Sequence, residues 1–115
     1  MEISRAVDLL GALAQDTRLA VFRHLVGAGP EGVTAGALAE RLGVPSPTLS
    51  FHLKELSRVE LVVGRAEGRF VRYSANFEAM NALLEYLVAH CCDGEGGCLP
   101  AAPTRAKPRR AAARA

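Results

Sequence analysis

The chain has 115 residues, half of them apolar, which suffices for one small domain with a single core. No apolar run approaches the roughly 20 residues of a membrane-spanning helix, and the start of the chain lacks the pattern of a secretory signal, so we expect a cytoplasmic protein with no membrane partner. The net charge is +2, but five cations after Leu99 leave a mildly acidic remainder, so affinity for nucleic acid must come from local clusters or that tail.

The first quarter of the chain predicts two helices. Apolar residues recur at helical spacing from Ile3 to Leu13. A second helical pattern follows Asp16, which we expect to be its N-cap, and continues to Val26. Gly27 and the glycine-rich residues after it end this pattern.

A short helix and a longer one follow, separated by a turn. Thr34 is the predicted N-cap of residues 35–42, and Gly43 closes that helix. The next helix begins at Ser46 and Pro47 and turns three leucines toward the core. His52 lies on its flank, and its outer face consists of Thr48, Phe51, Lys54, Glu55 and Arg58.

The spacing of the apolar residues then changes to the two-residue period of β-strands. Residues 61–65 and 69–74 are β-prone and are joined by residues 66–68, which predicts a two-stranded hairpin. Arg65 and Arg69 flank its tip, and Arg72 faces outward. The residues expected to face inward are Leu61, Val63, Val71 and Tyr73. A last helix follows Asn76, its predicted cap, over residues 77–90.

A short helix, a turn, a second helix and a basic hairpin together predict a winged helix-turn-helix, a mainly α fold with a two-stranded β wing. The segment "LAERLGVPSPTLSFHLKELSRVELVVGRAEGRFVRYSA" resembles the winged-helix core of the ArsR/SmtB family of bacterial metalloregulatory repressors. The segment "LAQDTRLAVFRHL" resembles the second helix of that family. The resemblance covers residues 5–90, and no pair of nucleophile and base indicates an enzyme.

The resemblance implies a homodimer that binds double-stranded operator DNA. The broad apolar stripes of the first and last helices independently favour a two-fold dimer that covers them. Ser46, Thr48, Ser50 and His52 occupy the DNA-facing positions of the family, with Lys54 as a phosphate partner and Arg69 and Arg72 along the backbone. Alternatives stay open: Ser46 as an N-cap, Ser50 as plain surface, His52 as a packing residue, and Phe51 in contact with a thymine methyl or packed.

All three cysteines lie near the end of the chain, at Cys91, Cys92 and Cys98. An odd number cannot pair completely within one chain, which favours metal binding or redox chemistry in a reducing compartment. The thiol pair that many family members carry before the turn is absent, as is the Asp and His pattern of the last helix. The arrangement resembles the C-terminal three-thiol site of some arsenite-responsive members, which implies As(III) as inducer, with Sb(III) a second candidate and no obligatory cofactor.

Soft thiolates select soft ions, and three sulfurs satisfy a trivalent arsenic centre. Structural zinc usually takes four ligands and fits less well, whereas cadmium, lead and mercury stay open. Cys91 and Cys92 can share one ion only where the helix ends, and the glycines at 94, 96 and 97 allow Cys98 to return. A thiol-based redox repressor and a metalloid-sequestering protein are the alternatives. We expect residues 1–99 to form the winged-helix domain with its thiol site and residues 100–115 a disordered basic tail.

Overall fold

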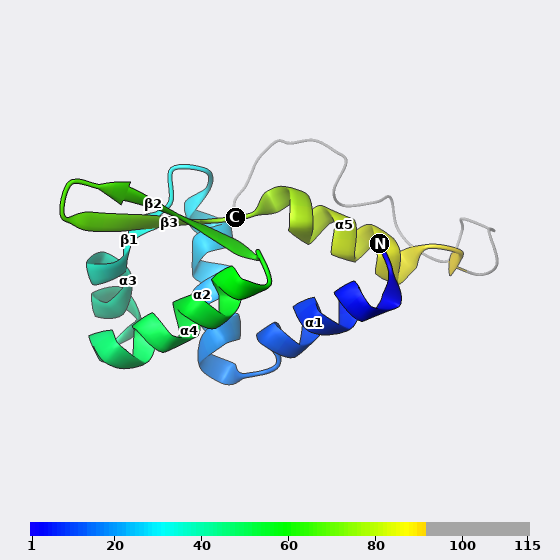
Figure 1. The fold of residues 1–115 in the computed structure, drawn as a ribbon, viewed down its shortest axis with the longest axis horizontal. Coiled ribbons are helices and arrows are strands. Elements are labelled where there is room, and N and C mark those ends of the chain that lie inside the picture. Colours follow the sequence, from blue (N-terminus) through cyan, green and yellow to red (C-terminus); the bar gives the residue numbers. More distant parts are fainter. Residues whose placement is uncertain (92–115) are drawn as a thin grey trace.

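The computed structural model describes residues 1–91, which form five helices and a small antiparallel sheet (Figure 1). The helices are α1 (Ile3–Leu13), α2 (Asp16–Ala28), α3 (Ala35–Leu42), α4 (Ser46–Arg58) and α5 (Phe77–Val88). The strands are β1 (Val33–Thr34), β2 (Val62–Glu67) and β3 (Phe70–Ala75). This order confirms the predicted winged helix-turn-helix and adds one short strand. The predicted tail, and with it the domain boundary at residue 99, lies outside the described residues.

The helix ends follow local capping chemistry. The Thr34 hydroxyl accepts a hydrogen bond from the amide of Ala37, and the Asn76 side chain accepts one from the amide of Ala79, so both predicted caps are confirmed. The prediction that Asp16 caps α2 is wrong, because the Gln15 side chain accepts the bond from the Arg18 amide instead. Asp16 is the first helical residue, where its charge still suits the positive end of the helix dipole.

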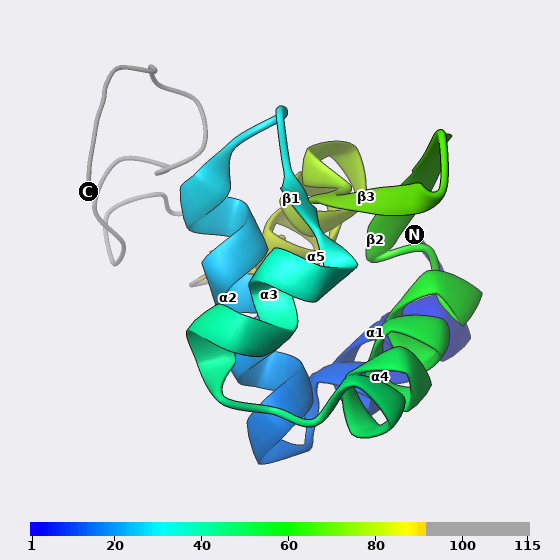
Figure 2. The ribbon, with the colours of Figure 1, turned by 90° about the vertical axis from the view of Figure 1, so that its left-hand side faces the viewer.

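The core lies where α1, α2 and α4 meet the base of the wing. Figure 2 looks at the molecule from the wing end and shows α3 and α4 in front of α1 and α5. Every helix contributes at least one buried apolar side chain, and α4 contributes the three leucines that its helical stripe predicted. The largest fully buried side chains are Leu9, Leu25, Leu38, Leu49, Leu53, Leu56, Leu61 and Val21. Among residues 1–91, no helix is long and apolar enough to cross a membrane.

The sheet has the strand order β1-β3-β2, with both pairs antiparallel. The hairpin is longer than predicted, since Glu67 pairs with Phe70 and leaves a two-residue turn. The expectation that Val63 faces inward is wrong: Val62 is buried against the core, and Val63 is 46 % exposed. Glu60 has a positive φ of 65°, so the chain bends before the strand, and alternation begins at Val62.

Val71 is a second exposed residue among those expected to face inward. It is paired with Ala66, and Tyr73 is paired with Gly64, so both lie on the sheet face that carries Val62. Tyr73 is half-buried near the core, whereas Val71 lies farther out along the hairpin, where the helices no longer cover it. The direction predicted for Val71 therefore agrees with the sheet, although the side chain is exposed.

Candidate nucleic-acid interface

The helix-turn-helix consists of α3, a tight turn and α4. Gly43 adopts a left-handed conformation with a φ of 66°, and its amide and that of Val44 donate hydrogen bonds to carbonyls in the last turn of α3. Pro45 precedes α4, and Pro47 occupies its first turn, where a missing amide proton costs nothing. These residues fix the angle at which α4 projects from the domain.

The outer face of α4 presents polar side chains to solvent. Ser46, Thr48, Ser50 and Lys54 are all exposed, as predicted for DNA-facing residues. Ser46 does not act as the N-cap, because that position is taken by Pro45. Within residues 1–91, none of these four side chains makes a hydrogen bond or an ion pair. They are therefore available to base edges and phosphates.

His52 differs from this group. The side chain is buried, with 7 % of its surface exposed, which agrees with the alternative that it is a packing residue. The Arg18 guanidinium lies 3.3 Å from its Nδ1 and donates to it, since arginine has no acceptor. Arg18 also donates from Nε to the carbonyl of Ala12, at 2.6 Å. Contact between His52 and DNA stays a prediction. The contact between His52 and Arg18 ties α4 to the junction of α1 and α2.

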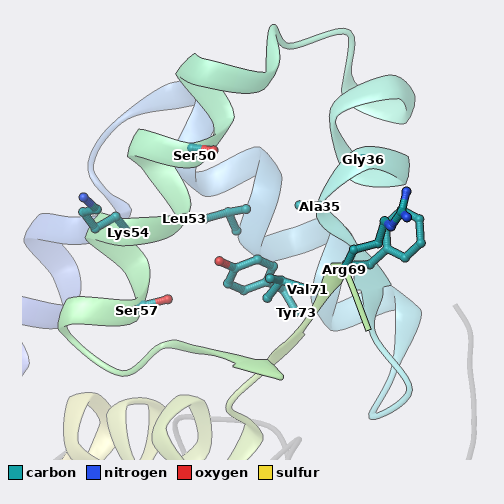
Figure 3. Close-up of a pocket in the computed structure, with 10 residues that line it drawn as sticks. Ala35, Gly36, Ser50, Leu53, Lys54, Ser57, Arg69, Val71 and Tyr73 are labelled. Atoms are coloured by element: carbon teal, nitrogen blue, oxygen red, sulfur yellow. The ribbon is translucent and has the colours of Figure 1, made fainter. Parts of the chain in front are cut away.

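A concavity of about 510 Å³ separates α4 from the wing (Figure 3). Ser50, Lys54 and Ser57 line it from α4, and Arg69 lines it from the wing. Leu53 and Tyr73 lie between them, and Ala35 and Gly36 contribute the start of α3. Lys54 and Arg69 place one cation on each side of the hollow, which is suited to a phosphate backbone that passes between a recognition helix and a wing.

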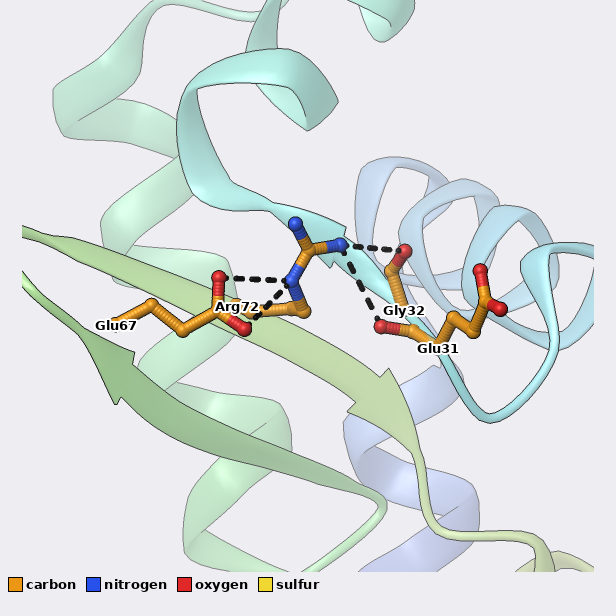
Figure 4. A network of polar contacts seen from close by, with 4 residues as sticks. All are labelled: Glu31, Gly32, Glu67 and Arg72. Carbon is orange, nitrogen blue, oxygen red and sulfur yellow. Dashed lines mark hydrogen bonds and ion pairs between the residues drawn. The ribbon is translucent and has the colours of Figure 1, made fainter.

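Arg72 makes several hydrogen bonds within the protein that the sequence does not predict. Its Nε donates to both carboxylate oxygens of Glu67 at 3.0 and 3.1 Å, and its Nη1 donates to the carbonyl of Gly32 at 3.3 Å (Figure 4). A further, longer contact of 3.5 Å reaches the carbonyl of Glu31. These bonds hold the wing to the loop before β1. Contact of Arg72 with DNA stays a prediction, whereas Arg65, its exposed cross-strand partner, makes no such bonds within residues 1–91.

An apolar surface lies on α1 and α5, at the end of the molecule opposite the wing (Figure 1). Ile3 is 70 % exposed, and Val7 and Leu10 follow at the spacing of one helical face. The exposed apolar residues of α5 are Leu84, Leu87 and Val88. A hollow of about 430 Å³ beside them is lined largely by apolar side chains of α2 and α5. Exposed apolar faces of this kind are typical of a protein interface.

The predicted thiol site begins just beyond α5. The helix ends at Val88, Ala89 is extended, and His90 has a positive φ of 62°, so the backbone turns sharply before Cys91. Cys91 is half-buried, and it is not part of an intact α-helix. Cys92 and Cys98 lie outside the described residues. Among residues 1–91, no three His, Cys, Asp or Glu side chains come together at a distance suited to a metal ion.

Comparison with known proteins agrees with this architecture. A family model described as a helix-turn-helix domain matches residues 13–65. The solved structure of HlyU from Vibrio cholerae is 33 % identical, with a TM-score of 0.62, over 80 % of this chain and 99 % of that one. An ArsR-like transcriptional regulator from Rhodococcus is 28 % identical, with a TM-score of 0.65, over 74 % of this chain and 77 % of its own.

A curated relative completes the comparison. The transcriptional repressor SdpR of Bacillus subtilis is 27 % identical over 81 residues, which are 70 % of this chain and 87 % of that protein. The matches cover the helix-turn-helix and extend beyond it, and the proteins named are regulators rather than enzymes. The chain therefore belongs to the ArsR family of winged helix-turn-helix transcriptional regulators.

Proposed function

We propose that this protein is a homodimeric repressor that binds operator DNA through α4 and the wing and releases it when Cys91, Cys92 and Cys98 bind As(III). The observation that carries the DNA-binding half is the exposed polar face of α4 beside a hollow lined by Lys54 and Arg69. The similarity to a transcriptional repressor supports repression as the outcome. The arsenite half rests on the chemistry of the thiols.

The proposed DNA contacts fall into two chemical groups, hydroxyls and cations. The hydroxyls of Ser46, Thr48 and Ser50 reach base edges or phosphates from the first half of α4, which is the part of a recognition helix that enters the major groove. Lys54 and Arg69 bind phosphates on either side of the hollow that separates α4 from the wing. His52 supports these residues from within, since its bond to Arg18 fixes α4 on the domain.

The dimer is formed by α1 and α5. Their exposed apolar faces, which no described residue covers, would be buried by a second copy related by a two-fold axis. Such a dimer places two α4 helices at a fixed separation, and this separation selects an operator with two similar half-sites. Because both helices belong to the interface, a change at either one alters the spacing of the two DNA-reading surfaces.

The thiols are suited to As(III) because three soft sulfurs satisfy a trivalent arsenic centre, and Sb(III) has the same requirement. Neighbouring side chains on an intact helix point apart, which would keep two adjacent thiols from binding one ion. Because α5 ends at Val88, before the first thiol, this constraint does not rule out the site. Cys91, Cys92 and Cys98 would hold the ion as thiolates. Because the thiols follow α5 directly, the interface helix links the inducer site to the DNA-reading surface.

Thermodynamic linkage between As(III) binding and DNA binding sets how far As(III) can lower operator affinity. As(III) releases DNA only if it binds the DNA-free conformation more tightly than the DNA-bound one, and such couplings are typically about 1–3 kcal/mol. This range corresponds to about a 5- to 150-fold loss of operator affinity. DNA must in turn weaken As(III) binding by the same factor.

The test begins with selection of a binding site from random duplex DNA, followed by titration of the reduced protein on that site. We expect As(III) and Sb(III) to release the DNA at lower concentration than Cd(II) or Zn(II). Release by peroxide, with indifference to As(III) under reducing conditions, would instead establish a redox repressor. Absence of any sequence-selective binding would contradict the repressor proposal and favour a sequestering protein.

A further inference from the structure

A large aromatic side chain, Phe51, lies on the outer face of α4, the helix proposed to read DNA. Phe51 is 56 % exposed in the middle of α4, among the polar residues of the outer face. An exposed phenylalanine contributes little to the core and leaves apolar surface in water. Its position is therefore better explained by an apolar group that covers it in a complex.

The orientation of the Phe51 ring is constrained from one side. It contacts the imidazole of His52 edge to face, with ring centroids 5.4 Å apart and an interplanar angle of 66°. That imidazole is itself held by the Arg18 guanidinium. Aromatic pairs of this geometry are favourable beyond their buried area, so His52 acts as a positioning residue for Phe51.

The place of Phe51 along α4 decides what it can meet. It is the sixth residue of the helix, on the same face as Pro47 one turn before and Lys54 one turn after. The first half of a recognition helix enters the major groove, while a cation farther along lies near the phosphates. With α4 in the major groove, Phe51 would be the exposed apolar side chain of the helix nearest the floor of the groove.

We propose that Phe51 reads the C5-methyl group of thymine. The methyl is the apolar feature that standard bases display in the major groove, and it distinguishes T·A from the other three arrangements of a base pair. This inference rests on the proposed function, because it requires that α4 lie in the major groove. It makes Phe51 a specificity-determining residue, whereas the neighbouring hydroxyls and Lys54 supply polar contacts.

The experiment replaces thymine by deoxyuridine, which removes the methyl and leaves the hydrogen-bonding edge intact. A site selected from random DNA is synthesised with one dT→dU change at a time, made symmetrically in both half-sites. For the wild-type protein we expect one position at which the change raises Kd by about fourfold per half-site, which is the effect of burying one methyl-sized group. The measurement is fluorescence anisotropy at fixed salt.

Two variants complete the thermodynamic cycle. Phe51→Ala should bind the dT and dU forms of that position equally well, because the ring that contacts the methyl is gone. Phe70→Ala is the comparison variant: Phe70 is similarly exposed, at 61 %, and lines the same hollow, but it lies on the wing and not on α4, so only the ratio of the two Kd values is compared. It should keep the wild-type discrimination between dT and dU.

The outcomes separate this inference from the function on which it rests. If a selective site exists but no dT→dU change affects the wild type, thymine reading is wrong while DNA binding stands. If Phe51→Ala discriminates as well as the wild type, another residue reads the methyl and the assignment is also wrong. Failure to select any site would overturn the proposed function and this inference together.

Discussion

Arg18 offers a sharp test of how α4 is fixed to the domain. The side chain joins three elements, because it extends from α2, donates to the Ala12 carbonyl at the end of α1 and donates to His52 of α4. Arg18→Met keeps most of the length of the side chain and removes both hydrogen bonds. The expected consequence is a less stable protein in which α4 is held less firmly.

The size of the loss follows from the two contacts. A hydrogen bond from a charged donor contributes about 1.5–3 kcal/mol, and a buried acceptor left without a partner costs about 1–3 kcal/mol. His52 Nδ1 would be such an acceptor, since its side chain is buried, whereas the Ala12 carbonyl can regain water. We therefore expect Arg18→Met to lower the free energy of unfolding by about 2–4 kcal/mol.

The assay is urea denaturation at one fixed protein concentration, because the proposed dimer would make stability depend on concentration. Arg5→Met is the matched control: Arg5 forms an exposed ion pair with Glu60 at 3.6 Å, and such pairs contribute about 0–1 kcal/mol. The double variant Arg18→Met with His52→Leu should lose less than the two single losses added together, since no unpaired acceptor remains. If Arg18→Met cost no more than Arg5→Met, this account of the junction would be refuted.

Three further predictions concern the proposed dimer, the wing and the tail. Val7→Glu places a charge on the apolar face of α1 and should convert the dimer to monomers in sedimentation velocity, with the helical circular dichroism signal retained. Arg69→Ala should weaken binding to all DNA sequences and reduce the slope of log Kd against log salt by about 2 per dimer; an unchanged slope would exclude a phosphate contact. Deletion of residues 100–115 should leave release by As(III) intact while reducing non-specific DNA affinity, and loss of the response would show that the tail belongs to the switch.

The helices were predictable because their signals are local. The leucine stripe of α4, the caps at Thr34 and Asn76 and the stop at Gly43 each depend on residues within a few positions of one another. The short strand β1 was missed, since two residues carry no detectable period, and it exists through its pairing with β3. The start of alternation in β2 depends on the bend at Glu60, which no pattern of apolar residues indicates.

The candidate site was predictable to the extent that it depends on one helical face. Ser46, Thr48, Ser50 and Lys54 follow from the position of the apolar stripe of α4 and are exposed as expected. The environments of His52 and Arg72 depend on residues 34 and 40 positions away, Arg18 and Gly32, and such contacts leave no trace in local spacing. The thiol site stays a prediction, since two of its three cysteines lie outside the described residues.

The most direct measurement of the central claim is operator release by As(III) in the wild type and in the single variants Cys91→Ser, Cys92→Ser and Cys98→Ser. Serine keeps the approximate shape and removes the soft sulfur, so each variant should dimerise and bind DNA normally but lose most of its response to As(III). X-ray absorption on the loaded wild type should report about three sulfur neighbours per arsenic, as expected for three thiolate ligands. If all three variants released DNA as the wild type does, the inducer site would lie elsewhere and the three-thiol account would be contradicted.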